Sequence, residues 1–154
     1  MVRNYMQTEV EVVQQDETAL EAAEKILSSG YASVPVVSEE GSVVGVVSEA
    51  DLLRLALPEP YLMLPDVSFL PPDATFIDAH GRERLSTVPV RDFMHKAPLY
   101  TVRPDTPVAE AALLMLHHHI RRVPVVEDGK LVGIITRADI LAAMVAATKQ
   151  SEEQ

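Results

Sequence analysis

The sequence of 154 residues predicts a mixed α/β (α+β) protein of two tandem β-α-β-β-α repeats, packed sheet to sheet around a pseudo-two-fold axis. Two observations lead to this fold class. The decapeptide GVVSEADLLR at 45–54 recurs with conservative changes as GIITRADILA at 133–142. In both copies, Val-rich runs joined by short polar turns alternate with segments of helical periodicity.

Shorter matches at spacings of 88 or 89 residues extend both copies. They pair VRNYM at 2–6 with VRDFM at 90–94, EAA at 21–23 with EAA at 110–112, and VPVV at 34–37 with VPVV at 123–126. These matches divide the chain into a first repeat at 1–57, a Pro-rich insert at 58–89, a second repeat at 90–148 and an acidic tail at 149–154. Apolar clusters such as YLMLP indicate that the insert is packed rather than a free linker.

The first helix of the first repeat has recognisable ends. Thr18 and Glu21 form a predicted capping box, and Gly30 is a natural stop. Between them, three residues recur on one face at helical spacing and are expected to point toward the core: Leu20, Ala23 and Leu27.

In the second repeat, Thr106-Pro107 opens the corresponding helix, with proline at a tolerated first position. Its predicted apolar face consists of Val108, Ala111, Ala112 and Met115. The EDGK sequence at 127–130 predicts a tight hairpin, which the longer SEEGS at 38–42 replaces in the first repeat. The last helix of each repeat is expected to begin at Ser48 and at Thr136.

Composition excludes several classes of protein. The chain has no cysteine, which excludes disulfides, thiolate metal sites and a cysteine nucleophile. The net charge of −10 argues against nucleic-acid binding, because phosphates require a basic surface. No apolar run reaches the ~18 residues of a membrane span, and the first residues lack the apolar core of a signal peptide. We therefore expect a cytoplasmic protein without membrane insertion.

The order of these motifs resembles the CBS domain, a family named after cystathionine β-synthase. In the second copy, the resemblance rests on VRDFM, YTVRPDTPVAEAALLMLHHHIRRVPVV and DGKLVGIITRADIL, and in the first on GYASVPVVSEEGSVVGVVSEADLLR. The two repeats together resemble a stand-alone CBS pair, or Bateman module. This resemblance implies an adenosine-containing regulatory ligand (AMP, ADP, ATP or sometimes S-adenosylmethionine) bound in clefts between the repeats. It also implies a homodimer and a regulatory, non-catalytic role.

Ser48 with Asp51, and Thr136 with Asp139, are the residues with the strongest physical case for binding such a ligand. They fall in the first turn of a helix, where free backbone N–H groups and the positive end of the dipole favour phosphate. The carboxylate can accept hydrogen bonds from the two ribose hydroxyls. The other expected nucleotide-binding residues are Val12, Tyr31, Ser33, Val34, Pro35, Thr101, Ile120, Arg121, Arg122, Val123, Pro124 and Arg137.

Each of these assignments has a simpler alternative. The S/T-x-x-D pattern is also an ordinary capping box that needs no ligand, and capping and ribose binding can coexist. The arginines match phosphate geometry, but they also suit a solvated surface. Tyr31 can stack on an adenine ring or cover the core. Thr101 stands at a family contact position, whereas its first-repeat counterpart is Val12, which weakens that site.

The run His117-His118-His119 suggests a metal site, but consecutive helical residues point about 100° apart and cannot chelate one ion together. A place at the C-terminal end of a helix, where a positive histidine is favoured, explains the run better. We therefore predict no metal site. No combination of Ser, His and Asp has catalytic spacing, so we predict no catalytic residue and no enzyme activity.

The sequence thus predicts a regulatory module that binds an adenine nucleotide and signals to an unidentified partner protein. The alternatives are a constitutive dimeric scaffold with degenerate clefts, or a sensor of S-adenosylmethionine or another adenosine compound. The site with Thr136 and Asp139 is expected to bind more tightly, because residues 91–150 carry a charge of +2 and residues 1–57 a charge of −7. Arg137 in one motif and Glu49 in the other favour the same ranking.

Overall fold

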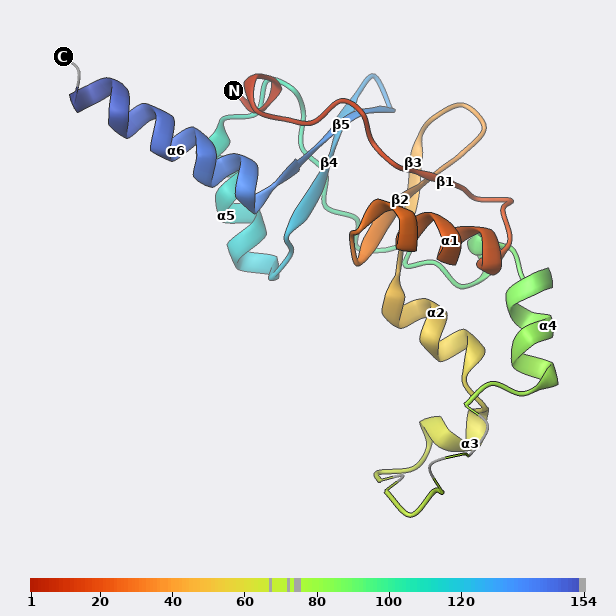
Figure 1. Ribbon diagram of the computed structural model, residues 1–154. Helices are drawn as coiled ribbons and strands as arrows, with labels where there is room; N and C mark the ends of the chain where they lie inside the picture. The colour runs from red at the N-terminus through yellow and green to blue at the C-terminus, as the bar shows by residue number, and fades with distance from the viewer. Residues whose placement is uncertain (67, 72, 74–75, 153–154) are drawn as a thin grey trace. The chain divides into compact units, whose positions relative to one another are not determined.

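Figure 1 shows the computed structural model of the chain, which describes residues 1–66, 68–71, 73 and 76–152. The chain forms two compact units. The first-repeat unit contains Glu11–Glu39 and Val44–Ala97. The second-repeat unit contains Met1–Val10, Glu40–Val43 and Pro98–Gln154. The chain is therefore a mixed α/β protein with two tandem repeats, as predicted.

The first repeat contains a three-stranded sheet in the order β1-β2-β3, with β1 parallel to β2. Its strands are β1 (Val13–Gln14), β2 (Ser33–Val37) and β3 (Val43–Ser48), and its helices are α1 (Ala19–Ser29) and α2 (Glu49–Ala56). The predicted ends of α1 are confirmed. Thr18 accepts a hydrogen bond from the Glu21 N–H at 3.2 Å, and Gly30 ends the helix with a φ of 76°.

The second repeat contains the antiparallel pair β4 (Arg122–Glu127) and β5 (Lys130–Thr136), together with α5 (Val108–His118) and α6 (Arg137–Glu152). The EDGK hairpin is confirmed: Asp128 and Gly129 form a two-residue turn with φ values of 52° and 79°. Helix α5 begins one residue later than predicted, with Pro107 at its N-cap rather than in its first turn.

The first strand predicted for the second repeat is reduced to a single parallel bridge between Val102 and Val125. In the first repeat, the N–H of Gln15 extends the ladder by donating to the Val37 carbonyl at 3.0 Å. The equivalent residue in the second repeat is Pro104, which has no N–H to donate. The ladder therefore ends after Val102.

The apolar face predicted for α1 is correct at Ala23, which is partly buried against the core, and wrong at its two leucines. Leu20 is 42% exposed and Leu27 is 79% exposed. The neighbouring stripe faces the core instead and consists of Ala19, Ala22 and Ile26. Both stripes have the same spacing, so periodicity alone does not distinguish them. The buried stripe begins with two alanines, whose small side chains let the helix lie close to the strands. The face predicted for α5 is correct, with Ala111 and Met115 buried.

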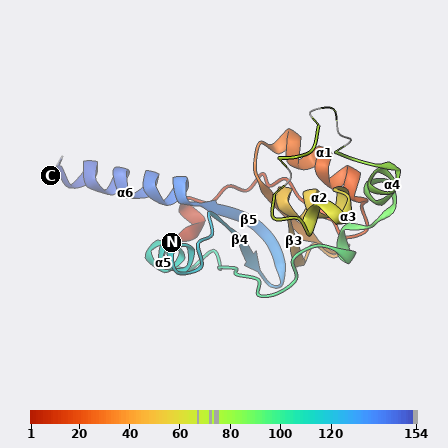
Figure 2. The ribbon, with the colours of Figure 1, turned by 90° about the horizontal axis from the view of Figure 1, so that it is seen from below.

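The end of the insert packs onto the first-repeat unit. Helix α4 (Ala79–Thr87) lies against α2 and α1 (Figure 2). The Arg84 guanidinium donates to the carbonyls of Leu55 at 2.7 Å and Leu57 at 3.3 Å, at the C-terminal end of α2. Because such carbonyls lack partners within their helix, Arg84 acts as a cap. The insert also holds the short α3 (Glu59–Leu62), while residues 67, 72, 74 and 75 lie outside the described part of the chain.

The segment that begins each sequence repeat packs into the unit formed by the other repeat. Gln7 pairs with Ile134 of β5 through two backbone hydrogen bonds of 2.8 and 2.9 Å, and His95 pairs with Val46 of β3 through bonds of 2.9 and 3.0 Å. Near these bridges lie the 3₁₀ turns Val2–Asn4 and Val90–Asp92. Val2 is buried in the core of the second-repeat unit, and Val90 in that of the first-repeat unit.

The exchanged segments explain the glycines at the start of the repeated decapeptide. A Cβ atom on Gly133 would lie 2.8 Å from the Gln7 carbonyl oxygen and 2.9 Å from the Met6 sulfur. A Cβ atom on Gly45 would lie 2.9 Å from the His95 carbonyl oxygen. Each glycine therefore lets the backbone at Gln7 or at His95 lie close to the strand, where a side chain would displace it.

Gly133→Ala should lower the free energy of unfolding by about 1–3 kcal/mol, because the added methyl group must displace the backbone of the crossing segment. Urea denaturation followed by circular dichroism measures this change. Lys130→Ala, at an exposed position of the same strand, is the control and should change stability by less than about 0.5 kcal/mol. An unchanged denaturation midpoint in Gly133→Ala would contradict the close approach.

Candidate functional site

The N-terminus of α2 is closed by a reciprocal capping box. The Ser48 hydroxyl accepts from the Asp51 N–H at 3.2 Å, and Asp51 Oδ2 accepts from the Ser48 N–H at 2.9 Å. The Ser48 hydroxyl also donates to Oδ2 at 2.9 Å. The other oxygen, Oδ1, accepts from the Arg54 guanidinium at 2.8 Å. The capping interpretation of this motif is thus confirmed, with one arginine added.

The N-terminus of α6 repeats this arrangement. Thr136 Oγ1 accepts from the Asp139 N–H at 3.1 Å, and Asp139 Oδ2 accepts from the Thr136 N–H at 2.9 Å. The additional donor here is the Gln7 side-chain amide, 3.3 Å from Oδ1 and 3.4 Å from Oδ2. Both capping carboxylates therefore have an internal partner. The partner of Asp51 is charged and close, whereas the partner of Asp139 is neutral and farther away.

Arg137 is the first residue of α6, and its side chain reaches the C-terminal end of α5, where it hydrogen-bonds to the backbone. Its guanidinium donates to the carbonyls of Ile120 at 3.1 Å and Met115 at 3.4 Å. A cation at this end of a helix is favoured by the negative end of the dipole. Glu49 takes the equivalent position in the first repeat and cannot make these contacts. Arg137 therefore has a structural role beside the predicted phosphate contact.

The residues predicted to surround the adenine differ in exposure. Val34, Pro35, Val123 and Pro124 are buried in the strands, so their side chains belong to the cores of their units. Partly buried positions are Val12, Ser33, Ile120 and Arg122, and exposed positions are Tyr31, Thr101 and Arg121. Among these residues, the exposed and partly buried side chains are the ones available for contact with a ligand.

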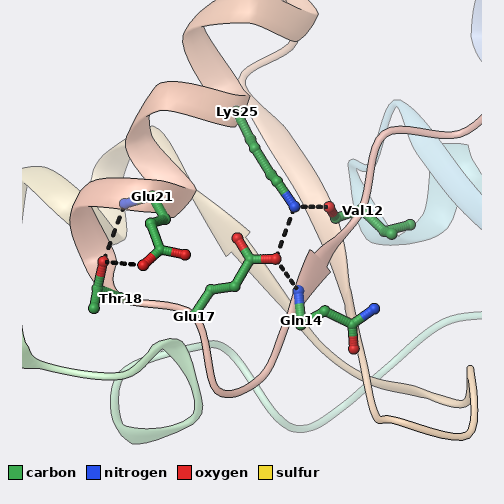
Figure 3. A network of polar contacts seen from close by, with 6 residues as sticks. All are labelled: Val12, Gln14, Glu17, Thr18, Glu21 and Lys25. Carbon is green, nitrogen blue, oxygen red and sulfur yellow. Dashed lines mark hydrogen bonds and ion pairs between the residues drawn. The ribbon is translucent and has the colours of Figure 1, made fainter.

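Val12 also takes part in a polar network between α1 and β1. The Lys25 ammonium group donates to the Val12 carbonyl oxygen at 3.2 Å and to Glu17 Oε1 at 2.7 Å (Figure 3). The same Glu17 oxygen accepts from the Gln14 N–H at 3.2 Å. Val12 is thereby held through its backbone, next to a lysine that sequence reasoning did not select.

The three consecutive histidines have three different environments. The His118 ring stacks on Tyr100 with centroids 3.9 Å apart, and His119 ends α5 with a φ of 55°, as Gly30 ends α1. His117 borders a groove beside α5. Across the described residues, no group of three or more His, Asp and Glu side chains is arranged to hold a metal ion.

Two side chains that donate to the capping carboxylates were not predicted from the sequence. Arg54 lies three residues after Asp51, a spacing at which opposite charges meet on a helix, so this contact had a local signal. Gln7 is 132 residues from Asp139, and no local pattern in the sequence indicated their contact.

Within the residues that the structure describes, each helix is too short or too polar to span a bilayer.

A family model described as "CBS domain" matches residues 2–58 and again residues 90–146. The chain belongs to the CBS domain family. Both matched ranges include the segment that packs into the other unit, and both contain one S/T-x-x-D motif. The two motifs are thus equivalent features of two CBS domains.

Curated relatives are similar along most of this chain. The uncharacterized protein MJ1426 of Methanocaldococcus jannaschii is 30% identical over 148 residues, which cover 87% of this chain and 85% of that protein. The A-adding tRNA nucleotidyltransferase of Aquifex aeolicus is 33% identical over 143 residues, which cover 93% of this chain but 14% of that protein. The chain therefore spans only a small part of that enzyme.

Solved structures of CBS-pair proteins share the fold. CBSX2 from Arabidopsis thaliana has a TM-score of 0.73 at 28% identity, with 96% of each chain covered. A structure described as CBSX2 in complex with AMP has a TM-score of 0.68 at 29% identity and covers 96% of this chain and 97% of that one. The fold of this CBS pair is therefore also that of a protein solved with AMP.

Proposed function

We propose that this CBS pair is a regulatory module that binds an adenosine-containing ligand of the AMP, ADP or ATP type and signals to a partner protein. The observation that supports it most is the repeated helix N-terminus at which Ser48–Asp51 and Thr136–Asp139 hold a carboxylate in the first turn. The solved CBSX2 with AMP, similar over 96% of this chain, supports the same ligand class.

Capping leaves room for a ribose at the carboxylate. A carboxylate offers about four acceptor positions, and the cap uses one oxygen of Asp139. The long contacts from Gln7 occupy the remaining positions with a neutral donor. Two ribose hydroxyls can replace this single amide group, and the positive end of the helix dipole favours the phosphates. We expect Gln7 to move aside when the ligand binds.

The two sites should differ in affinity. A ribose at Asp51 has to compete with the Arg54 guanidinium at 2.8 Å, whereas a ribose at Asp139 competes with an amide at 3.3 Å or more. A short contact between two opposite charges is stronger than a long hydrogen bond from a neutral amide to a carboxylate. This difference supports the ranking predicted from the sequence. The grounds are new, because Arg137, on which that ranking partly relied, hydrogen-bonds to carbonyls at the end of α5.

A constitutive scaffold is the second candidate function. The observation that favours it is that both carboxylates already have partners inside the chain, as expected of motifs kept for capping alone. S-adenosylmethionine or another adenosine compound remains the alternative ligand. We infer a binding module rather than an enzyme, since the two CBS domains account for most of the chain. The cytoplasmic location stays a prediction.

The homodimer that the family resemblance implies also stays a proposal. It is supported by exposed leucines at equivalent helical positions of the two repeats. Leu27 and Leu116 form one equivalent pair and Leu53 and Leu141 the other, and all four are at least 60% exposed. Leucines in this setting are better explained by contact with a second copy than by contact with water.

Binding of an adenine nucleotide should raise the melting temperature. A ligand at 100 times its dissociation constant stabilises the native state by about 2.7 kcal/mol, which corresponds to several degrees for a domain of this size. Differential scanning fluorimetry with AMP, ADP, ATP and S-adenosylmethionine measures the shift, with cytidine monophosphate as the control for the base. If none of the adenosine compounds shifts the melting temperature at millimolar concentration, the scaffold is the better account.

Asp139→Ala should weaken nucleotide binding at least tenfold more than Asp51→Ala, a difference of about 1.4 kcal/mol. Each variant keeps its N-cap residue and loses the equivalent carboxylate bond of the capping box, so their stabilities should fall by similar amounts, about 1 kcal/mol. Isothermal titration calorimetry on the two folded variants measures the affinities. Equal losses, or a larger loss in Asp51→Ala, would refute the ranking.

A further inference from the structure

A groove of about 400 Å³ lies in the second-repeat unit, between Thr101–Arg103 and one face of α5. Its volume is within the range of small-molecule sites. The walls combine apolar and polar side chains, chiefly Thr101, Thr106, Glu110, Leu113 and Leu114. Thr136 and Asp139 do not border it, and of the predicted nucleotide contacts the lining includes Thr101 alone.

The equivalent place in the first repeat is filled by a lysine of the chain itself. Helices α1 and α5 have equal length and align at a spacing of 89 residues, which pairs Val12 with Thr101, Glu17 with Thr106, Glu21 with Glu110 and Lys25 with Leu114. Lys25 extends from α1 toward β1, and its ammonium group bonds to the Val12 carbonyl and to the Glu17 carboxylate (Figure 3). In the second repeat, Leu114 supplies no ammonium group.

The second repeat keeps much of the surroundings of that ammonium group. The backbone of Thr101 stands where Val12 offers its carbonyl, Thr106 offers a hydroxyl in place of a carboxylate, and Glu110 supplies a negative charge. Leu113 and Leu114 form an apolar wall, a suitable contact for an aliphatic stem. The groove thus has acceptors at one part of its lining and methyl groups at another.

We propose that this groove binds a primary ammonium group carried on a short aliphatic stem and supplied from outside the chain. The ammonium group would take the place that Lys25 occupies in the first repeat, with its three donors directed to Thr101, Thr106 and Glu110. The stem would lie along Leu113 and Leu114.

The charges around the groove fit a cation. Arg103 borders the groove, but its guanidinium bonds to Asp105 at 3.1 Å. The hydrogen bond from Arg103 lowers the pKa of the Asp105 carboxyl, and the negative charge of Asp105 offsets the positive charge of Arg103. Glu110 then supplies the groove with a negative charge that has no such offset among the acidic and basic lining residues.

Nuclear magnetic resonance on the full chain at pH 7.5 tests the proposal, with n-butylamine as the probe and n-butanol as the uncharged control. The amine should shift the amide signals of residues 101–118 in a saturable way, and the alcohol should bind at least tenfold more weakly. Putrescine and Nα-acetyl-lysine amide then distinguish the source of the ammonium group. Tighter binding of putrescine indicates a free diamine, and tighter binding of the lysine amide indicates a protein side chain.

A pair of matched variants makes the test specific. Thr106→Glu with Leu114→Lys rebuilds the first-repeat network in the second repeat and should weaken amine binding at least tenfold, while the fold remains. Glu17→Thr with Lys25→Leu opens the first-repeat groove and should let n-butylamine shift signals of residues 12–29. The proposal is overturned if n-butanol binds as well as the amine, or if the Thr106→Glu, Leu114→Lys variant folds and binds the amine with unchanged affinity.

Discussion

The backbone pairing of Gln7 with Ile134, matched by that of His95 with Val46, is the contact on which the rest of the structure depends. It ties the segment that begins each sequence repeat to the last strand of the other repeat. Val2 and Val90, which accompany these segments, complete the two cores. A repeat as read along the sequence is therefore not a folding unit by itself, because part of its core comes from the other repeat.

This exchange also shapes the functional sites. Ile134 lies two residues before Thr136, so a residue paired with it is next to the first turn of α6. Gln7 is held in that place, and its amide reaches the Asp139 carboxylate. The equivalent residue beside α2 is His95, and there the carboxylate of Asp51 is met by Arg54 instead. One geometry thus gives two sites whose carboxylates have partners of different charge and distance.

Much of the fold could be predicted from the sequence, because its signals are local. The Asp-Gly turn, the cap of α1 and the caps at Ser48 and Thr136 are set by residues within a few positions of one another. Pro104 was also a local signal, because a proline has no N–H to donate and therefore ends the strand pairing at this position. The buried stripe of α1 was not predictable, because two stripes of equal spacing run along that helix and only packing decides between them.

The exchange of segments and the surroundings of the site could not be predicted. Two repeats with the same motifs allow either pairing of VRNYM and VRDFM, within a repeat or between repeats, and both satisfy the same hydrophobic pattern. Gln7 beside Asp139 follows from that choice. Arg137 was assigned to phosphate from its chemistry, but only the structure reveals the carbonyls of Met115 and Ile120 within its reach.

Amide hydrogen exchange in a pair of proline variants tests the exchange of segments most directly. Gln7→Pro removes the N–H that donates to Ile134, and His95→Pro removes the one that donates to Val46. The structure predicts that Gln7→Pro reduces the protection of the Ile134 amide and leaves that of Val46 unchanged, and that His95→Pro does the reverse. Loss of protection at Val46 in Gln7→Pro, with Ile134 still protected, would show that each segment pairs within its own repeat and would contradict the account.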